Sequence, residues 1–477
     1  MSTRRLLAAL AAAALAGCTL GPDYLRPLFD SPAKYRVDYP QAADVANTKW
    51  WEQFGDPVLN QLVEDALRGN LDVRIAAARV DRFLGILQTT RSQFFPQIGY
   101  SYDASANRAS RLGQPPLAPN ADNTYNLYQG ALGASWQIDL FGRVRRQSEA
   151  AQAQVYASEQ GRRGVILSLV ATVAASYIGL RALDRQLEIA QGTAKNYGDT
   201  AKLFELRLKG GVISEVEMGQ VESQYQQALA AVPALEQSIA AQENLISVLL
   251  GRNPGPIPRG KTIDQLVPPA IPAGLPSELL ERRPDILQAE QNLVSANAQI
   301  GAAKALYFPQ ISLTGTLGSI STAFSTFLTG PAGAAMLALG VSGPLFTFGA
   351  IEGQVKSAEA GRDEALFSYQ QTVLNAFRET NDALVGSLKK REEVEALDRR
   401  VAALRNYARL SRLRFDNGAA SYVEVLVAEN DLFGAELNAV GTGAERFAQI
   451  INVYKAMGGG WVDVSDAIAS PPKEAKK

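Results

Sequence analysis

Two short stretches, FFPQIGYSY at residues 94–102 and YFPQISLTG at residues 307–315, nearly repeat each other, with starts 213 positions apart (307 − 94). In each stretch a proline is followed by residues that alternate between apolar and polar. Proline disfavours a helical conformation in the residue before it, so a helical pattern ends there. Alternation with a period of two is typical of a strand whose two faces meet different surroundings. Each stretch therefore predicts a helix that passes directly into a strand.

The two stretches belong to a longer internal repeat. Phe141-Gly142 matches Phe348-Gly349 at an offset of 207 positions (348 − 141). Upstream the offset is 213, because the first copy has six extra residues (213 − 207) in the loop-like stretch RLGQPPLAPNADN, residues 111–123. Chance matching of alanine-rich helices is the alternative, but glycines and aromatic residues match as well. The other matched pairs are Arg207 with Arg414, Gly211 with Gly418, Ser214 with Ser421, Glu217 with Glu424, and Gly251 with Gly458.

The alternation predicts one hairpin of two strands in each copy, at about residues 97–139 and about residues 310–345. Strands of about ten residues cross a bilayer when they are tilted. We therefore predict that the apolar face of each hairpin meets lipid. A soluble hairpin buried against another domain is the alternative, and the polar opposite face argues against it. The aromatic residues expected to face lipid are Tyr100, Tyr102, Tyr128 and Trp136.

A long helical pattern follows each hairpin. Apolar residues recur at spacings of three and four without any proline, over roughly 65 residues or about 95 Å of helix. A pattern of this length favours a coiled-coil-like array over a compact core. Turns at Gly211 and Gly418 end the two runs, and a return helix follows each turn. The predicted helices are residues 144–209 and 215–250 in the first copy, and residues 352–415 and 422–457 in the second.

Local signals add detail to the helices. Asp56 precedes Pro57 at the start of an amphipathic pattern, which favours Asp56 as an N-cap. The return helices have weak points at equivalent positions, Pro233 and Val440-Gly441 (233 + 207 = 440). Proline removes a helical hydrogen bond and clashes with the preceding turn. We therefore expect a kink or break near the middle of each return helix.

The N-terminus reads MSTRRLLAALAAAALAGC, with two arginines, an apolar run and small residues, which is the layout of a secretory signal. Cys18 follows Leu15-Ala16-Gly17, the spacing at which bacterial lipoprotein precursors are cleaved and acylated. Lipidation of Cys18 would anchor the protein to a membrane. Thr19 rather than aspartate follows, which in similar lipoproteins indicates sorting to the outer membrane. The alternative is an ordinary signal with an incidental thiol at Cys18.

These patterns divide the chain into six segments. A proline-rich stretch between the copies is predicted to be an extended strap. The segments are a signal peptide at 1–17, a lipid-anchored extended segment at 18–48, the first repeat at 49–251 with its long helices at 144–250, the strap at 252–280, the second repeat at 281–461 with its long helices at 352–457, and a disordered tail at 462–477.

Composition excludes several classes of function. The 47 basic and 48 acidic residues nearly cancel, so no basic field indicates nucleic acid. Histidine is absent, and the chain has one cysteine and four methionines. The commonest general base and the usual soft-metal ligands are therefore missing or scarce. We expect neither an enzyme, nor a cofactor, nor a metal site.

Four membrane-length strands are too few to close a barrel. An open sheet edge is not tolerated in hydrocarbon, because its backbone groups have no partners there. We therefore expect a barrel shared between copies of the chain, with eight strands from two copies or twelve from three. Helices of about 95 Å would extend such a barrel as a tube. A lipid anchor, a shared barrel and a helical tube together describe a conduit.

Four motifs, which span the chain from Cys18 to Trp461, resemble the TolC-type outer-membrane factors of tripartite efflux pumps, in their lipoprotein branch. The resemblance implies a mainly α-helical trimer with a twelve-stranded outer-membrane β-barrel that continues into a long periplasmic α-helical barrel, with the strap at its equator. It also implies a periplasmic adaptor and an inner-membrane, proton-driven transporter of the RND type as partners. The motifs are WWEQFGDPVLNQLVEDALRGNLDV, WQIDLFGRVRRQSEAA, RRPDILQAEQNLVSANAQIGAAKALYFPQISLTG and YKAMGGGW.

The resemblance also places a constriction at the periplasmic tips of the helices. The family pattern is close to G-x-x-S-Y-L-x-V-L-D-A, whose leucine and aspartate narrow the pore. Here GAASYVEVLVAEN (residues 418–430) has Val423 and Val427 at those positions. The two valines are one helical turn apart and predict an apolar constriction, with Glu424 as a source of charge. Asp416, beside the turn, is a candidate to pair with Arg414 across chains.

Other interpretations stay open at this point. The valines could instead pack against a neighbouring helix. A periplasmic adaptor or structural lipoprotein would also use a lipid and helical hairpins, but it has no need of lipid-facing strands. A type I protein-secretion conduit is the nearest alternative among channels. The favoured prediction is an efflux channel that exports drugs or other small amphiphilic compounds.

Overall fold

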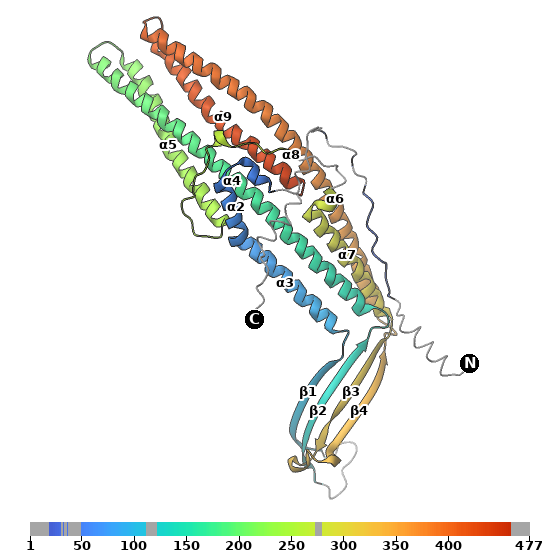
Figure 1. Ribbon diagram of the computed structural model, residues 1–477. Coiled ribbons are helices and arrows are strands. Elements are labelled where there is room, and N and C mark those ends of the chain that lie inside the picture. The colour runs from blue at the N-terminus through green and yellow to red at the C-terminus, as the bar shows by residue number, and fades with distance from the viewer. Residues whose placement is uncertain are drawn as a thin grey trace. The chain divides into compact units, whose positions relative to one another are not determined.

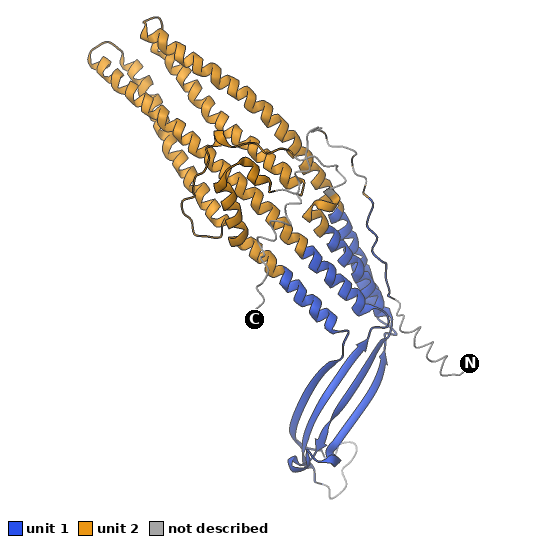
Figure 2. Ribbon diagram, in the orientation of Figure 1, with its two compact units in different colours: residues 1–28, 80–158, 289–369 blue, residues 29–79, 159–288, 370–477 orange. Residues whose placement is uncertain are grey.

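The structure is a computed structural model that describes residues 19–29, 32, 36, 49–110, 122–271 and 279–458. It has two compact units, which Figure 2 shows in different colours. Both copies of the sequence repeat contribute to both units, so the units do not follow the repeat boundaries. Unit 1 comprises residues 1–28, 80–158 and 289–369, and unit 2 comprises residues 29–79, 159–288 and 370–477.

Unit 1 contains one antiparallel sheet in the order β1-β2-β3-β4 (Figure 1). The hairpin of the first copy joins the hairpin of the second copy through pairing of β2 with β3. β1 begins directly after Pro96 and β3 directly after Pro309, as the alternation predicted. The strands are β1 (Gln97–Arg108), β2 (Thr124–Ile138), β3 (Gln310–Ser321) and β4 (Gly333–Ser342).

The register of the sheet separates an apolar face from a polar face. Tyr100 lies opposite Leu132, and Leu132 lies opposite Leu317. The other face carries serine, threonine, glutamine and glycine, because successive residues of a strand point to opposite sides. Both β1 and β4 are edge strands. The apolar face comprises Ile98, Tyr100, Tyr102, Tyr128, Leu132, Ala134, Trp136, Ile311, Leu313, Leu317, Leu337, Leu339 and Val341.

Four long helices have residues in both units, and within unit 1 their contacts follow the order of the strands. Arg91 of α3 donates to Gln152 of α4 at 2.8 Å, and Gln154 of α4 donates to Asn292 of α7 at 3.4 Å. Lys304 of α7 pairs with Glu359 of α8 at 3.0 Å. The four helices are α3 (Leu71–Ser92), α4 (Arg143–Lys209), α7 (Pro284–Lys304) and α8 (Ala350–Asp416).

Unit 2 has an apolar core around an aromatic cluster. Trp50 is fully buried and stacks on Tyr454, with ring centroids 5.1 Å apart. The buried face of α4 contributes to the same core, and 72% of its most apolar stretch is buried, so this stretch is a core segment. The remaining elements of unit 2 are η2 (Trp50–Phe54), α2 (Pro57–Gly69), α5 (Glu215–Leu249), η3 (Ile263–Gln265), α6 (Leu279–Arg282) and α9 (Tyr422–Ala456). Three short helices belong to unit 1, namely η5 (Ala305–Tyr307), η6 (Phe324–Thr326) and η7 (Gly330–Ala332).

The duplication is visible in the helix lengths, because α4 and α8 each have 67 residues and α5 and α9 each have 35. A kink or a break was expected in each return helix, and the structure shows no break at either position. Pro233 lies inside a continuous α5, and Gly441 lies inside a continuous α9. Pro233 lies on an exposed part of α5. Water can therefore donate a hydrogen bond to the backbone carbonyl that proline, which has no N–H, leaves without a donor. A glycine inside a helix costs only about 1 kcal/mol.

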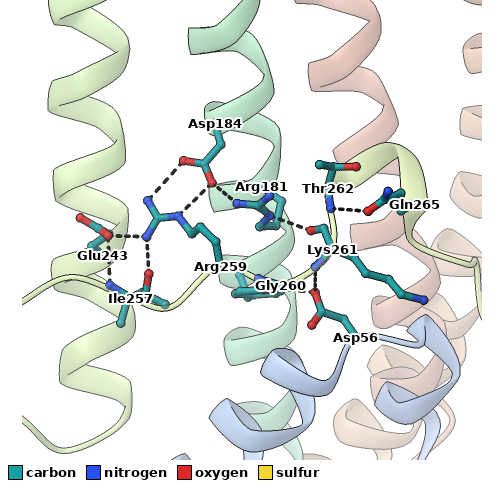
Figure 3. A network of polar contacts seen from close by, with 11 residues as sticks. Asp56, Arg181, Asp184, Glu243, Ile257, Arg259, Gly260, Lys261, Thr262 and Gln265 are labelled. Atoms are coloured by element: carbon teal, nitrogen blue, oxygen red, sulfur yellow. Dashed lines mark hydrogen bonds and ion pairs between the residues drawn. The ribbon is translucent and has the colours of Figure 1, made fainter.

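A polar network attaches the strap to the helices of unit 2 (Figure 3). The buried carboxylate of Asp56 caps α2 by accepting from the Val58 N–H at 2.8 Å, which confirms the predicted N-cap. It also accepts from the Tyr177 hydroxyl and from the Lys261 N–H, both at 2.9 Å. The Tyr177 hydroxyl in turn accepts from the Gly260 N–H at 2.9 Å. Burial, together with Asp56, raises the pKa of Tyr177 and keeps it a donor.

Arg259 extends this network to two helices. Its guanidinium pairs with Asp184 of α4 at 3.0 Å and with Glu243 of α5. Burial opposes ionisation of Glu243, but the hydrogen bonds from Arg259 and from the Ile257 N–H outweigh it and lower the pKa of that carboxyl. Asp184 also accepts from Arg181, which donates to the Lys261 carbonyl at 2.8 Å. The strap therefore adds ion pairs to the contact between α4 and α5.

The strap provides a matched pair of glycines for a stability test. A Cβ at Gly260 would lie 2.1 Å from Asp56 Oδ1, whereas a Cβ at Gly255 would meet nothing closer than 4.0 Å. We expect Gly260→Ala to lower the stability of unit 2 by about 1–3 kcal/mol, because the buried carboxylate must move away from its donors. Gly255→Ala is the control. Thermal unfolding in detergent, followed by the fluorescence of the buried Trp50 and Trp51, measures the difference, and equal melting temperatures would contradict it.

Candidate functional site at the hairpin tips and the sheet

The two helical hairpins end in turns of the same conformation. Gly211 has φ of +67° and Gly418 has φ of +72°, in the left-handed region that favours glycine. In each turn the residue after the glycine donates its N–H to an arginine carbonyl, Val212 to Arg207 at 2.9 Å and Ala419 to Arg414 at 2.8 Å. This bond satisfies a carbonyl at the end of the helix. The structure therefore places both predicted turn glycines at hairpin tips.

Aromatic side chains pack the two tips of unit 2 against each other. The ring of Phe204 lies 4.3 Å from that of Tyr422, and the ring of Phe415 lies 5.0 Å from that of Tyr422, centroid to centroid. The Arg207 guanidinium lies over both phenylalanine rings at 5.6 Å. Sequence reasoning missed this cluster, because its members are about 200 positions apart. The buried members of the cluster are Ala201, Phe204, Val221, Tyr422, Val425 and Leu426.

Val423 and Val427 lie on the opposite, exposed side of α9. Their exposed fractions are 44% and 49%, whereas Val425 and Leu426 are 0% and 5% exposed. Neither of the two exposed valines belongs to the apolar cluster between the tips. Packing within this chain therefore leaves both valines about half exposed. They form a small apolar patch, one helical turn long, on the exposed side of α9.

The charged residues of the second tip have partners within the chain. Glu424 accepts a hydrogen bond from Arg414 at 2.8 Å and one from Ser411 at 3.4 Å. Asp416 pairs with Arg412 at 3.6 Å. Asp416 and Arg414 stay candidates for contacts across chains, and within the chain each already has one partner. Exposed pairs of this kind stabilise a fold by at most about 1 kcal/mol.

The matching residues of the first tip are connected differently. Glu217 accepts from the Ser214 N–H at 2.8 Å and Ser214 accepts from the Glu217 N–H at 3.3 Å, which makes a capping box. At the second tip Ser421 makes no side-chain cap. Glu424, the counterpart of Glu217, instead accepts a hydrogen bond from Arg414. The two tips thus have the same backbone conformation but differ in their polar contacts.

One carboxyl beside the tips is partly buried. Burial raises the pKa of Glu429, and Arg412, whose Nη1 lies 3.9 Å from its Oε1, acts in the opposite direction. The pKa of this carboxyl is therefore higher than that of an exposed glutamate.

The predicted aromatics of the sheet fall at three levels of the apolar face. Tyr102 and Tyr128 lie at the loop end, where they contact Phe327 and Phe324 with ring centroids 5.7 and 5.6 Å apart. These phenylalanines, from the loop between β3 and β4, were not predicted from the sequence. Trp136 lies at the other end of β2 and donates to the Phe94 carbonyl at 2.9 Å.

Aromatic residues therefore flank both ends of the apolar face. Tyr128 and Trp136 are eight positions apart, which is about 27 Å along a strand. A strand tilted by about 40° covers about 21 Å of height over this length, which is most of the apolar band of a membrane barrel, about 25 Å tall. Tyr100 lies between the two levels, opposite Leu132, and is 87% exposed. It is part of the apolar band and does not lie at either end.

Residues 19–24 dock on the helices of unit 1. The Arg146 side chain, 5% exposed, donates to the Leu20 carbonyl at 3.0 Å and pairs with Asp23 at 2.7 Å. Thr19 lies against Gly142, where a Cβ would be 3.0 Å from the Thr19 Cα. Gly142 connects β2 to α4. Cys18 itself lies outside the described residues, but its neighbour is held where a strand passes into a helix.

Comparisons with known proteins agree with this geometry. A family profile described as "Outer membrane efflux protein" matches residues 62–252 and 275–459, one range for each copy of the repeat. The chain is 32% identical to the toluene efflux pump outer membrane protein TtgC of Pseudomonas putida, over 97% of this chain and 96% of that protein. It is 31% identical to the cation efflux system protein CusC of Escherichia coli, over 97% of this chain and 100% of that protein.

A solved structure extends the likeness to three dimensions. The MtrE outer membrane channel of Neisseria gonorrhoeae, in its open state, superposes with a TM-score of 0.84 at 29% identity, over 93% of this chain and 99% of that one. The duplicated helices, the four-stranded sheet and the sequence likeness lead to one conclusion. The chain belongs to the outer membrane efflux protein family.

Proposed function

We propose that three copies of this chain form the outer-membrane channel of a tripartite efflux pump that exports drugs or other small amphiphilic compounds. One observation carries the proposal: the sheet has an apolar face, a polar face and two open edges. Because edges in hydrocarbon need partners, such a sheet would be part of a barrel shared between copies of the chain, and three copies would give twelve strands. Its apolar face would meet lipid and its polar face would line water.

The partners and the class of activity follow from the same proposal. A periplasmic adaptor and an inner-membrane transporter of the RND type would complete the pump, since an outer-membrane channel has no energy source of its own. The chain would act by transport and not by catalysis. The relatives named for toluene and cation efflux support a role in export, and the compounds exported here would be chosen by the inner-membrane partner.

The tips would form the periplasmic gate of the channel. In a threefold assembly, the exposed Val423 and Val427 would each contribute to a ring, and two apolar rings one turn apart resist the passage of water and ions. Glu424 would place a charge beside these rings, held by Arg414 at 2.8 Å. The aromatic cluster between the tips would keep the two hairpins of a protomer moving together.

The N-terminus would add a lipid anchor. Acylation of Cys18 would supply about 0.8 kcal/mol of membrane affinity for each buried methylene. The docking of residues 19–24 on Arg146 would hold the anchor beside the end of β2, where the apolar face begins. The anchor and the sheet would then enter the same membrane.

Deletion of the gene tests the proposed function directly. We expect the deletion to lower the minimal inhibitory concentration of at least one compound in a panel of lipophilic antibiotics, dyes and detergents, and re-expression of the chain to restore it. A photo-crosslinking residue at the exposed position Val216, on the first tip, should capture the adaptor. Unchanged resistance to every compound, together with capture of no periplasmic protein, would refute the proposal.

Substitutions at the tips test the gate. We expect Val423→Ala and Val427→Gly to raise the resting single-channel conductance in planar bilayers, because each widens an apolar ring. Val427→Asp should shift selectivity toward cations. Val248→Ala is the control, since Val248 is 61% exposed at the far end of α5. If all three tip variants conduct like the control, the constriction lies elsewhere.

Metabolic labelling tests the anchor. We expect the chain to incorporate radioactive palmitate and Cys18→Ser to incorporate none, because Cys18 is the only cysteine of the chain. Wild-type protein should remain with the membrane after extraction that releases peripheral proteins. Equal labelling of the two chains, or no labelling of either, would remove Cys18 as the anchor.

A further inference from the structure

The loop between β3 and β4 folds back onto the sheet. β3 ends at Ser321 and β4 begins at Gly333, so the loop comprises residues 322–332. It contains the short helices η6 and η7, at the end of the sheet away from the long helices (Figure 1). A loop in this place could extend across the mouth of a barrel or lie along its outside. The contacts of its aromatic side chains show which course it takes.

The ring of Phe327 lies on the apolar face of the sheet. A Cβ at Gly130 would be 2.7 Å from Phe327 Cζ, and its three nearest atoms would all belong to this ring. Gly130 lies opposite Tyr102 and Ser319, so that Cβ would project from the same face as Tyr102. Ser319 is two residues before the end of β3, so the loop returns by about 7 Å along the strand. Phe327 thus fills the space that glycine leaves in β2.

Phe324 lies on the same face and extends it. Its ring centroid is 5.6 Å from that of Tyr128, which lies opposite Ser321 at the end of β3. Phe324 is still 67% exposed after this contact, and Leu328, the residue after Phe327, is 88% exposed. The loop therefore adds two large apolar side chains to the apolar face, at the level of Tyr128.

The polar face at this level is free of the loop. Asp103 lies opposite Gln129, and Gln129 lies opposite Ile320. Within the described ranges of the chain, no hydrogen bond or ring contact joins these three residues to the loop, and Ile320 is 51% exposed. A loop that covered the pore would contact this face. The contacts of this loop instead place it on the outside of the sheet.

The second hairpin carries no charge. The 47 residues between Lys304 and Glu352 (352 − 304 − 1) include no aspartate, glutamate, lysine or arginine. The first hairpin differs, because Asp103, Arg108 and Asp122 lie in its strands and loop. Charge on a lipid-facing surface is destabilising, whereas a loop in water tolerates it. The composition of the second loop therefore fits lipid better than water.

The loop also satisfies most of its own hydroxyl groups. The Ser321 hydroxyl donates to the Ala323 carbonyl at 2.8 Å and lies 2.6 Å from the Thr326 hydroxyl. The Thr329 hydroxyl donates to the Thr326 carbonyl at 2.6 Å. The other two hydroxyl side chains of residues 321–329 are exposed, as suits a position among lipid headgroups. Polar groups that enter a membrane need internal partners of this kind, because hydrocarbon offers none.

We propose that the loop of residues 322–332 is an interfacial anchor that binds the acyl chains of the outer leaflet through Phe324 and Leu328. The inference rests on the proposed function, because it needs the apolar face of the sheet to lie in the membrane. The long helices are then on the periplasmic side and the loop is on the outer side. Phe327 attaches the loop to the sheet, and the two exposed side chains enter the edge of the hydrocarbon at the level of Tyr128.

Spin labelling measures the surroundings of the loop. The purified channel is reconstituted into vesicles of phosphatidylcholine and phosphatidylglycerol with a nitroxide at Leu328→Cys, and a chain without an added cysteine gives the background from Cys18. The matched control is Ile320→Cys, beside the loop on the opposite face. We expect the ratio of oxygen collisions to collisions with a polar nickel chelate to be at least about tenfold higher at Leu328, because hydrocarbon dissolves oxygen and excludes the chelate.

A third position separates this inference from the proposed function. Leu132 lies in the middle of the apolar face and is 58% exposed, so a nitroxide at Leu132→Cys reports whether the sheet itself is in lipid. A preference for oxygen at Leu132 with a preference for nickel at Leu328 would overturn the anchor and leave the channel standing. A preference for nickel at both positions would overturn both proposals. A Leu328 label that meets neither reagent would show that protein covers the loop, which also overturns the anchor.

A valine in β2 tests the attachment of the loop. Gly130→Val puts side-chain atoms where the ring of Phe327 lies, so the loop should leave the apolar face. We expect the collision ratio at Leu328 to fall by about tenfold, because the label then meets water. An unchanged ratio would overturn the anchor as proposed, since Phe327 would not be what holds the loop in lipid.

The control for this variant is a valine at another glycine of the same strand. A Cβ at Gly133 would meet nothing closer than Thr316 Cγ2, at 3.9 Å, so Gly133→Val should leave the ratio at Leu328 unchanged. The label at Leu132 should keep its preference for oxygen in both valine variants, which shows that the barrel still forms. An equal fall at Leu328 in the two variants would mean that a valine in β2 disturbs the sheet and would remove the support for the Phe327 contact.

Discussion

The need to pair every backbone N–H and C=O group in hydrocarbon determines most of this structure. The described part of a single chain supplies four strands in one sheet, and β1 and β4 each leave one side unpaired. Water satisfies such groups at the edge of a soluble sheet, but a bilayer does not. The sheet is therefore complete only as part of a larger barrel. Oligomerisation in this protein is a requirement of backbone chemistry before it is a matter of side-chain affinity.

Duplication gives this requirement a simple solution. The contact that joins the two copies within a chain uses β2, β3, Phe141 and Phe308. The counterparts of β2 and β3 in the repeat are β4 and β1, which form the outer edges of the sheet. One kind of interface can then serve both inside a chain and between chains. The copies have diverged where symmetry is not needed, as in the polar contacts of Glu217 and Glu424 at the tips.

Local signals in the sequence predicted the elements well. Proline and alternation located the starts of β1 and β3, and Asp56 before Pro57 identified an N-cap. Outcomes that depend on distant neighbours were not predictable. Pro233 is tolerated because its side of α5 is exposed. Phe324 and Phe327, from the loop between β3 and β4, contact tyrosines of the sheet. Ser421 lacks a capping box because Glu424 bonds to Arg414 instead.

The unpaired edges of the sheet also bear on how the protein reaches its membrane. A newly made monomer cannot place β1 and β4 in lipid without leaving two rows of polar groups unsatisfied, at a cost of several kcal/mol for each group. Insertion and association then have to occur as one event. The rate of insertion would rise with more than the first power of monomer concentration, so that expression level governs the speed of biogenesis as well as the final amount of channel.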